Sequence, residues 1–358
     1  MTGSMSGFVV RPSSYSASAG AVSRITDRAT QPLKRGSVLT QPSIGGFIIS
    51  NHYLVTGGCG FIGSHLCDAL LTAGHSVTVL DDLSSGIEAN LPPAANLILG
   101  SICDEAIVAR AVDGIDGCFH LAAIASVERS VRDWAATHRV NLGGTVSLLD
   151  RIARNGAVPF VYASSAAVYG ASGDLPLRED GRVAPVSAYG ADKYACELHA
   201  HVATHTHAIP TTGLRFFNVY GPRQDPRSPY SGVLSIFAER LAIGRSVCIF
   251  GDGEQTRDFV YVADVVRAMM AAMVHPSPTP RVFNVCTGTA TSVLDLARAA
   301  AEVCGTHLAV EHGPARSAEV RHSVGDTTAL TAALCVTAQT PLPAGVHAVV
   351  DWLRTVSK

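Results

Sequence analysis

The chain has 358 residues and a mass of 37.3 kDa, which is enough to bury a large core in one large domain or two smaller ones. Its hydrophobic fraction of 47% and its balance of 27 Lys and Arg against 29 Asp and Glu indicate a globular, soluble protein. No apolar run approaches the roughly 18 residues of a membrane span, so the sequence argues against a membrane partner.

The first 49 residues differ in composition from the rest. They are rich in serine and carry five basic residues but a single acid, Asp27. We expect a disordered tail; the alternatives are an organelle transit peptide, a misassigned start codon and a simple solvated extension. Without this segment the body carries a charge of about −6, which gives no reason to expect a nucleic-acid partner.

The nine cysteines contain no Cys-x-x-Cys pair, and several fall in apolar runs. This pattern predicts reduced core thiols in a reducing compartment, the cytoplasm, and no structural zinc site. Histidines between 199 and 207 have near-helical spacing, which a solvated helix end explains better than a metal site. We therefore expect no metal.

The first predicted elements are a short apolar strand over 53–56, a glycine turn, and a helix that begins near Ile62. Gly57, Gly60 and Gly63 allow positive φ angles and a close approach of the backbone to a ligand. The N-terminus of the following helix offers unpaired N–H groups to a pyrophosphate. The pattern predicts a nucleotide-binding turn.

A second predicted strand over 77–80 ends in Asp81, 18 residues after Gly63. A carboxylate at this place accepts hydrogen bonds from the adenosine ribose and repels a 2′-phosphate. The sequence therefore favours NAD over NADP as the cofactor.

Apolar runs then alternate with helical patterns, which predicts a parallel sheet covered on both faces. We expect further strands at 97–99, 118–121, 160–163, 211–216 and 281–285, and helices at 107–112, 141–155 and 188–205. Beyond Gly221 the pattern loosens and prolines mark a loop. The predicted fold class is α/β: a Rossmann doubly wound parallel sheet over 50–220, with return segments near 250–286, and a smaller C-terminal α/β substrate-binding lobe over 221–358.

Lys193 is the only lysine in the body of the chain apart from the last residue, and Tyr189 lies four residues before it. In a helix this spacing places both side chains on one face. An ammonium group beside a phenol favours the phenolate and so makes a general base. Lysine suits this role better than arginine because it is a compact, rotatable donor. A fortuitous surface pair is the alternative.

Six motifs, in order, carry a resemblance to a known family. They are TGGCGFIG at 56–63, HLAA at 120–123, YASSAAVYG at 162–170, YGADK at 189–193, LRFFNVYGPRQDP at 214–226 and GDGEQTRDFVYV at 251–262. From about residue 52 to the C-terminus the chain resembles the extended short-chain dehydrogenases/reductases, and most closely the UDP-sugar 4-epimerases. The resemblance implies an NAD-dependent enzyme that forms a homodimer through two helices, one of which bears Tyr189 and Lys193.

The resemblance also implies roles for single residues. Tyr189 would be the acid/base, Lys193 would orient it and contact the nicotinamide ribose, and Ser165 would hydrogen-bond the sugar hydroxyl that is oxidised. The residues expected to contact or support NAD are Gly57, Gly60, Phe61, Ile62, Gly63, Asp81, Ile102, Leu121, Ala122, Ala123, Asn141, Tyr189, Lys193 and Phe217. Those expected to contact the UDP-sugar are Ser126, Ser165, Tyr189, Asn218, Val233, Arg257, Arg316 and Ser323.

Tyr189, Ser165 and bound NAD would together permit an epimerisation. Loss of the 4-hydroxyl proton and of a hydride gives a 4-keto sugar, and return of the hydride to its opposite face inverts the centre with no net redox change. Dehydratases of the superfamily place an Asp–Glu pair where this chain has Ala166 and Ala167, which cannot transfer protons. A decarboxylase of the UDP-xylose synthase type is disfavoured for the same segment. A non-enzymatic NAD-sensing protein is disfavoured because Tyr189 and Lys193 are both present.

The substrate depends on finer features. Ser323, seven residues after Arg316, resembles the small residue that leaves room for an acetamido group in epimerases of N-acetylated UDP-hexosamines, and Ser126 matches the same subgroup. We expect UDP-GlcNAc and UDP-GalNAc; the alternatives are UDP-glucose and UDP-galactose, then an NDP-sugar dehydratase or a UDP-uronate epimerase. Two departures, Gly-Ser-Ile at 100–102 in place of Gly-Asp-Ile and Ala318 in place of glycine, are expected to weaken affinity without removing a catalytic group.

Overall fold

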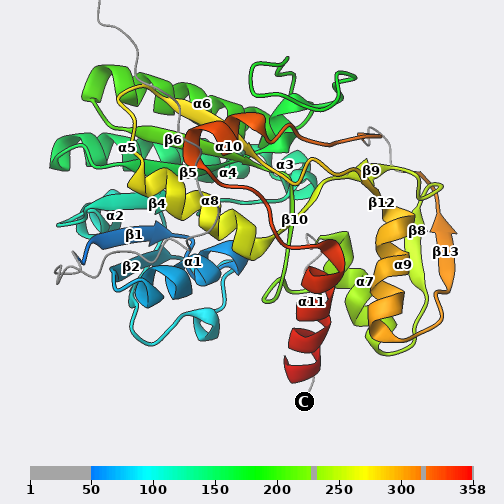
Figure 1. Ribbon diagram of the computed structural model, residues 1–358. Coiled ribbons are helices and arrows are strands. Elements are labelled where there is room, and N and C mark those ends of the chain that lie inside the picture. The colour runs from blue at the N-terminus through cyan, green and yellow to red at the C-terminus, as the bar shows by residue number, and fades with distance from the viewer. Residues whose placement is uncertain (1–49, 227–231, 316–319, 357–358) are drawn as a thin grey trace, which may run out of the picture. The chain divides into compact units, whose positions relative to one another are not determined.

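The computed structural model describes residues 50–226, 232–315 and 320–356. The expected tail over 1–49 and Arg316 lie outside these ranges. Seven strands form one parallel sheet: β1 (His52–Thr56), β2 (Ser76–Asp81), β3 (Asn96–Leu99), β4 (Gly117–His120), β5 (Phe160–Ser165), β6 (Thr211–Phe216) and β11 (Arg281–Val285). Their order across the sheet is β11-β6-β5-β4-β1-β2-β3 (Figure 1). This is the predicted doubly wound arrangement.

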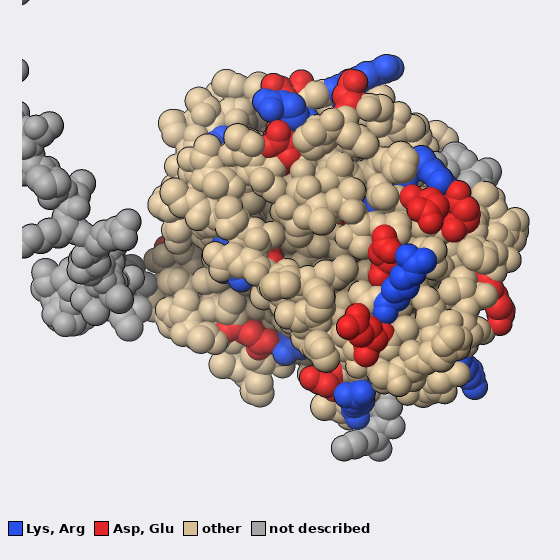
Figure 2. Space-filling model, turned by 45° about the vertical axis from the view of Figure 1, so that its right-hand side comes forward, with Lys and Arg blue, Asp and Glu red and all other residues tan. Residues whose placement is uncertain are grey.

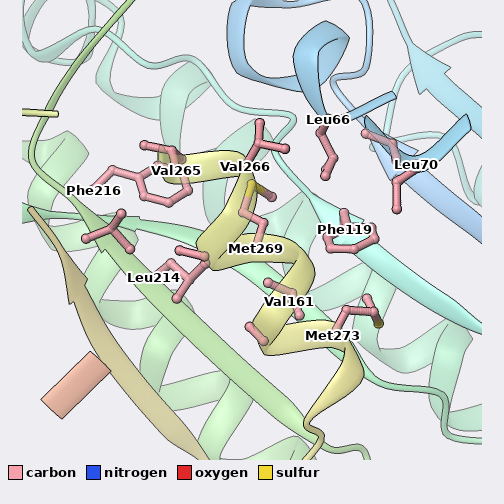
Figure 3. Close-up of a cluster of buried hydrophobic side chains, with 14 of the residues drawn as sticks. Leu66, Leu70, Phe119, Val161, Leu214, Phe216, Val265, Val266, Met269 and Met273 are labelled. Atoms are coloured by element: carbon pink, nitrogen blue, oxygen red, sulfur yellow. The ribbon is translucent and has the colours of Figure 1, made fainter. Parts of the chain in front are cut away.

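Alternate side chains of each strand enter two different cores. On one face, α1 (Phe61–Thr72), α8 (Val262–Val274) and α10 (Thr328–Leu334) cover the sheet. Figure 3 shows how Val265, Met269 and Met273 of α8 lie over Phe119 and Leu214 of the strands. On the other face, α2 (Glu105–Ala111), α5 (Gly144–Asn155) and α6 (Ala188–His207) enclose the second core. The near-continuous apolar strands of the sequence therefore fit a sheet buried on both sides.

A third core lies in the C-terminal part of the chain. It is formed by α7 (Val233–Ala242), α9 (Val293–Cys304) and α11 (Leu342–Val356) with β8 (Val247–Phe250) and β13 (Val310–Gly313). Two short strand pairs form separate small sheets: β7 (Asn218–Tyr220), before α7, pairs with β10 (Phe259–Tyr261), and β9 (Thr256–Arg257) pairs with β12 (Thr291–Ser292), both after α7. The third core is compatible with a separate lobe, and the domain limits near 220 stay a prediction.

The helix predicted over 141–155 has a different start. α5 begins at Gly144, and the preceding residues Arg139–Gly143 form a π-helical turn after the short helices α3 (Val127–Arg132) and α4 (Trp134–His138). The carbonyl oxygen of Asn141 accepts hydrogen bonds from the hydroxyl of Thr145, at 2.6 Å, and the thiol of Cys196, at 3.3 Å. π turns of this kind are frequent at functional sites.

The described residues contain neither a membrane-spanning helix nor a disulfide. None of the helices within 50–226, 232–315 and 320–356 has the length and apolarity needed to cross a bilayer. All nine cysteines fall in those ranges and are unpaired; five are buried, while Cys103, Cys248 and Cys335 are exposed. On the face in Figure 2, basic and acidic side chains lie in small mixed groups on a largely uncharged surface.

Candidate active site

The candidate site lies at the carboxyl edge of the sheet. β1 has β2 on one side and β4 on the other, so the chain reverses its direction of travel across the sheet at this point. In open α/β sheets, ligands bind in the crevice outside such a switch point. Gly57 follows β1, Asp81 ends β2, Leu121 follows β4, Ser165 ends β5 and Phe217 follows β6. The fold thus collects the predicted residues at one edge.

The glycine turn forms a cradle that side chains would fill. Gly57 has a φ of 72°, and a Cβ there would lie 2.7 Å from the backbone nitrogen of Ala122. A Cβ on Gly63 would lie 2.2 Å from the carbonyl oxygen of Gly57, whereas one on Gly60 would meet a single atom, at 3.2 Å. No side chain caps α1, and its first turn contains no acid. These features fit a pyrophosphate at the helix N-terminus.

Asp81 lies beside this cradle. Its carboxylate accepts hydrogen bonds from the backbone N–H groups of Cys59 and Leu83, each at 2.9 Å, and the residue is 7% exposed. Burial raises the pKa of Asp81, and the two N–H bonds oppose that rise. Each oxygen keeps a lone pair for a ribose hydroxyl. The carboxylate and the cradle therefore both fit NAD.

Lys193 is buried behind the predicted base. It is 4% exposed, and its Nζ donates a hydrogen bond to the carbonyl oxygen of Ala163, two residues before Ser165, at 2.8 Å. The same Nζ lies 5.9 Å from the centre of the Tyr189 ring. An ammonium has three N–H donors, so two are left for the phenol and a ribose. The expected shared face of Tyr189 and Lys193 is present.

Gly190 brings the start of α6 against the turn that carries Ser165. A Cβ at Gly190 would lie 2.6 Å from the carbonyl oxygen of Ala167, so no other residue fits without movement. Ser165 and Tyr189 are both half-buried. Gly190 is not among the residues predicted from the sequence. It could have been noticed because a glycine inside a helix costs about 1 kcal/mol relative to alanine and so needs a structural reason.

His120 is a second residue that the sequence analysis missed. It is 3% exposed between the hydroxyl oxygens of Thr56, at 2.7 Å, and Thr145, at 2.9 Å. Burial, together with the charge of Lys193, lowers the pKa of His120 to about 3, so it is neutral near pH 7. Thr56 in turn accepts from the backbone N–H of Ala122, at 3.2 Å. This buried chain holds the loop after β4.

Four predicted contact residues have buried side chains with other partners. Asn141 is 1% exposed; its amide accepts from the N–H of Ile124 at 2.7 Å and donates to the same residue's carbonyl at 3.2 Å. The Ser126 hydroxyl accepts from the N–H of Arg129 at 3.0 Å and so caps α3. Ile102 and Phe217 pack in apolar clusters. Direct contacts of these residues with NAD or substrate stay predictions.

Three of the residues predicted to hold the UDP-sugar, Asn218, Arg257 and Ser323, come together from distant segments. Asn218 is exposed and pairs with Phe259 through β7 and β10, two residues from Arg257. Arg257 Nη1 donates to the carbonyl of Thr256 at 2.8 Å. The N–H of Ser323 donates to the same carbonyl at 3.1 Å. Val233 begins α7.

Asp258 ties this region together and was not predicted. It is fully buried, and its carboxylate accepts from the N–H of Thr287 at 2.7 Å, from the N–H of Gly288 at 2.9 Å and from the N–H of Gly325 at 3.4 Å. Burial raises its pKa against these bonds. The sequence did contain a hint of this role, because Asp258 is an acid placed between Arg257 and an apolar run.

The described geometry agrees with known proteins. A family model described as the NAD dependent epimerase/dehydratase family matches residues 53–286. A UDP-glucose 4-epimerase of Mycolicibacterium smegmatis is 39% identical over 312 residues, 85% of this chain and 99% of that protein. The crystal structure of UDP-glucose 4-epimerase from Thermotoga maritima with UDP-glucose has a TM-score of 0.83 and 38% identity, covering 86% of this chain and 100% of that chain.

A third comparison concerns the N-acetylated sugars. A UDP-N-acetylglucosamine 4-epimerase from Methanobrevibacter ruminantium, in complex with UDP-N-acetylmuramic acid, is similar with a TM-score of 0.82 and 32% identity, covering 86% of this chain and 99% of that chain. The family resemblance, the fold and NAD as the cofactor are confirmed. The chain belongs to the NAD-dependent epimerase/dehydratase family of extended short-chain dehydrogenases/reductases, in its UDP-sugar 4-epimerase branch.

Proposed function

We propose that this enzyme inverts the 4-hydroxyl group of a UDP-sugar through a transient 4-keto sugar. The observation that carries the proposal is the placement of Lys193 behind Tyr189, with its Nζ bonded to the strand that ends in Ser165. The glycine cradle at Gly57 and Gly63 lies at the same edge of the sheet. Base, alcohol-binding hydroxyl and nucleotide turn therefore come from one edge of the sheet.

In this mechanism the protein moves one proton. Ser165 Oγ accepts from the N–H of Ala167 at 3.2 Å, which leaves its O–H free to donate to the sugar O4. Tyr189, beside Lys193, is the base that takes the proton of the 4-hydroxyl and later returns it. Bound NAD supplies the hydride acceptor and donor at sugar C4. Because the ketone must turn over between the two transfers, the pocket has to hold UDP firmly and the sugar loosely.

Ala166 and Ala167 argue against a dehydratase. They form the turn directly after Ser165. Elimination of water needs an acid and a base near the sugar, and methyl groups supply neither. A dehydratase would release a 4-keto product that absorbs in alkali, whereas an epimerase releases only its two UDP-sugars.

We propose UDP-GlcNAc and UDP-GalNAc as the preferred pair, ahead of UDP-glucose and UDP-galactose. The support is Ser323, a small residue whose backbone N–H donates to the carbonyl oxygen of Thr256, the residue before Arg257. A hydroxymethyl group there leaves more room for an acetamido group than an aromatic ring does. The test is chromatography of the purified protein with four UDP-sugars and no added cofactor. Faster turnover of UDP-glucose than of UDP-GlcNAc would overturn the substrate proposal.

Ser323→Tyr is expected to lower kcat/KM for UDP-GlcNAc by about 10-fold or more and to leave UDP-glucose nearly unchanged, because the added ring fills the proposed acetamido space. Initial rates with both substrates measure this. Thr279→Tyr, on the exposed segment before β11, is the matched control and should change neither rate. Equal losses for both sugars in Ser323→Tyr would contradict the role of this position.

We propose that two copies of the chain pair through α6. Its outer face carries the apolar residues Ala191, Ala195, Leu198 and Val202, and the last two are each 52% exposed. α4 packs against α6 and adds Trp134, 67% exposed. Sedimentation should give a dimer, and Leu198→Glu with Val202→Glu should give a monomer. Val274→Glu, at an exposed apolar position on α8, should not; a wild-type monomer would refute the pairing.

A further inference from the structure

A buried ion pair lies one helical turn beyond Lys193. Glu197 is 7% exposed and Arg215, on β6, is 4% exposed. Arg215 donates from Nε to Glu197 Oε1 at 2.9 Å and from Nη2 to Glu197 Oε2 at 2.7 Å. This two-point bond fixes both distance and orientation between α6 and the sheet.

The pair also reaches both sides of Ser165. Ser164, the preceding residue on β5, donates its hydroxyl to Glu197 Oε1 at 2.5 Å. Arg215 Nη1 donates to the phenol oxygen of Tyr169, at the end of the turn after Ser165, at 2.9 Å. The Tyr169 hydroxyl then donates to Asn284 Oδ1, on β11, at 2.6 Å. The Glu197–Arg215 pair therefore joins the strand of Ser165, its following turn and the helix of the base.

We propose that Glu197 and Arg215 are positioning residues that set the distance between Ser165 on β5 and the Tyr189–Lys193 pair on α6. The inference rests on the proposed roles of these three residues. Glu197 and Lys193 are four residues apart and share the helix face toward the sheet. Lys193 has one described hydrogen bond to the protein, through Ala163. The ion pair adds a second, rigid attachment of α6 to the sheet, which the single hydrogen bond from Lys193 to the Ala163 carbonyl does not give.

We expect that the fold stays stable without these two charges. A buried ion pair replaced by apolar residues of similar volume often leaves stability unchanged or raises it, whereas removal of one partner leaves a buried charge. The double variant Glu197→Leu with Arg215→Met therefore removes the orienting bonds while keeping the core filled. A shift of the base by about 1 Å lowers the rate on the order of 100-fold.

The experiment measures kcat, KM, NAD content and melting temperature, on whichever UDP-sugar the wild-type enzyme epimerises. The double variant is expected to lose 10- to 100-fold in kcat, on the scale expected for such a shift, with KM, NAD content and melting temperature near wild type. Ser164→Ala, which removes only one bond to Glu197, is expected to lose a few-fold in kcat by the same mechanism.

The control is Asp264→Asn, a buried carboxylate on α8, on the face of the sheet opposite α6, that accepts from the N–H groups of Gln339 and Thr340. It is expected to lower the melting temperature and leave kcat unchanged. Wild-type kcat in the folded double variant would overturn the inference, as would an equal fall of kcat in Asp264→Asn. Absence of UDP-GlcNAc turnover in the wild type would refute only the substrate proposal.

Discussion

Tyr189→Phe is expected to lower kcat by about 1,000-fold or more while NAD stays bound. The phenol oxygen is the only atom removed, and proton transfer by a positioned acid/base contributes up to about 10,000-fold to a rate. Lys193 keeps its hydrogen bond to Ala163, and the glycine cradle is untouched. The measurement is the initial rate of UDP-sugar interconversion, together with the NAD released on denaturation.

Tyr194→Phe is the matched control for this change. Tyr194 lies on the same helix, is half-buried and packs against the cluster of Val168, Tyr169 and Leu177. It should keep wild-type kcat and NAD content. A Tyr189→Phe enzyme with kcat within a few-fold of wild type would show that another group moves the proton, and the mechanism would then be wrong.

Gly63→Ala is expected to weaken the binding of NAD, so that the purified protein retains less of it. The new methyl carbon would lie 2.2 Å from the carbonyl oxygen of Gly57 and 2.8 Å from Cα of Gly58. Both are backbone atoms of the turn, so the strain is relieved only by moving the turn away from α1. Overpacking of this kind costs about 1–3 kcal/mol, which corresponds to roughly a 5- to 150-fold loss of affinity if it falls on the bound form.

The measurement for Gly63→Ala is NAD content after gel filtration and the dissociation constant for added NAD. Gly173→Ala is the control, because a Cβ at that glycine meets nothing within 4 Å. It should retain NAD as the wild type does. Stoichiometric NAD in the Gly63→Ala protein would contradict the placement of the pyrophosphate at this turn.

Local pattern predicted most of the sheet. The strands expected at 211–216 and 281–285 are β6 and β11 with the same bounds, and the strand expected at 160–163 is the first part of β5. Such segments are readable because a strand buried on both faces must be apolar throughout and bounded by turns. The glycine turn was readable for a different reason: Gly57 needs a positive φ, and Gly63 needs the absence of a side chain.

Contacts between residues far apart in the sequence could not be predicted from local pattern. Glu197 and Arg215 are 18 residues apart on different elements, and the bond forms because β6 lies beneath α6. His120 shows no polar neighbour along the chain, and its hydrogen bonds to Thr56 and Thr145 span 64 and 25 residues. The role of Gly58 could not be predicted either, because a Cβ there would lie 2.6 Å from Val79 Cγ2. Packing against β2 explains that glycine.

The π turn around Asn141 was missed for a related reason. The helical pattern of 141–155 continues through it, and the bond that distinguishes it is made with Cys196 on another helix. Ser126 shows the opposite case. The resemblance implied a substrate contact, which stays a prediction, and the structure adds a helix cap, a role for which serine is preferred at any helix start.

The most direct test of the central claim uses a UDP-sugar carrying deuterium at C4, incubated with purified enzyme in ordinary water without added cofactor. If Tyr189 moves only the hydroxyl proton and the C4 hydrogen is held in the same site, the inverted product keeps its deuterium in full. Analysis of both UDP-sugars by NMR or mass spectrometry gives the answer. Hydrogen from water at C4 of the product would contradict the account.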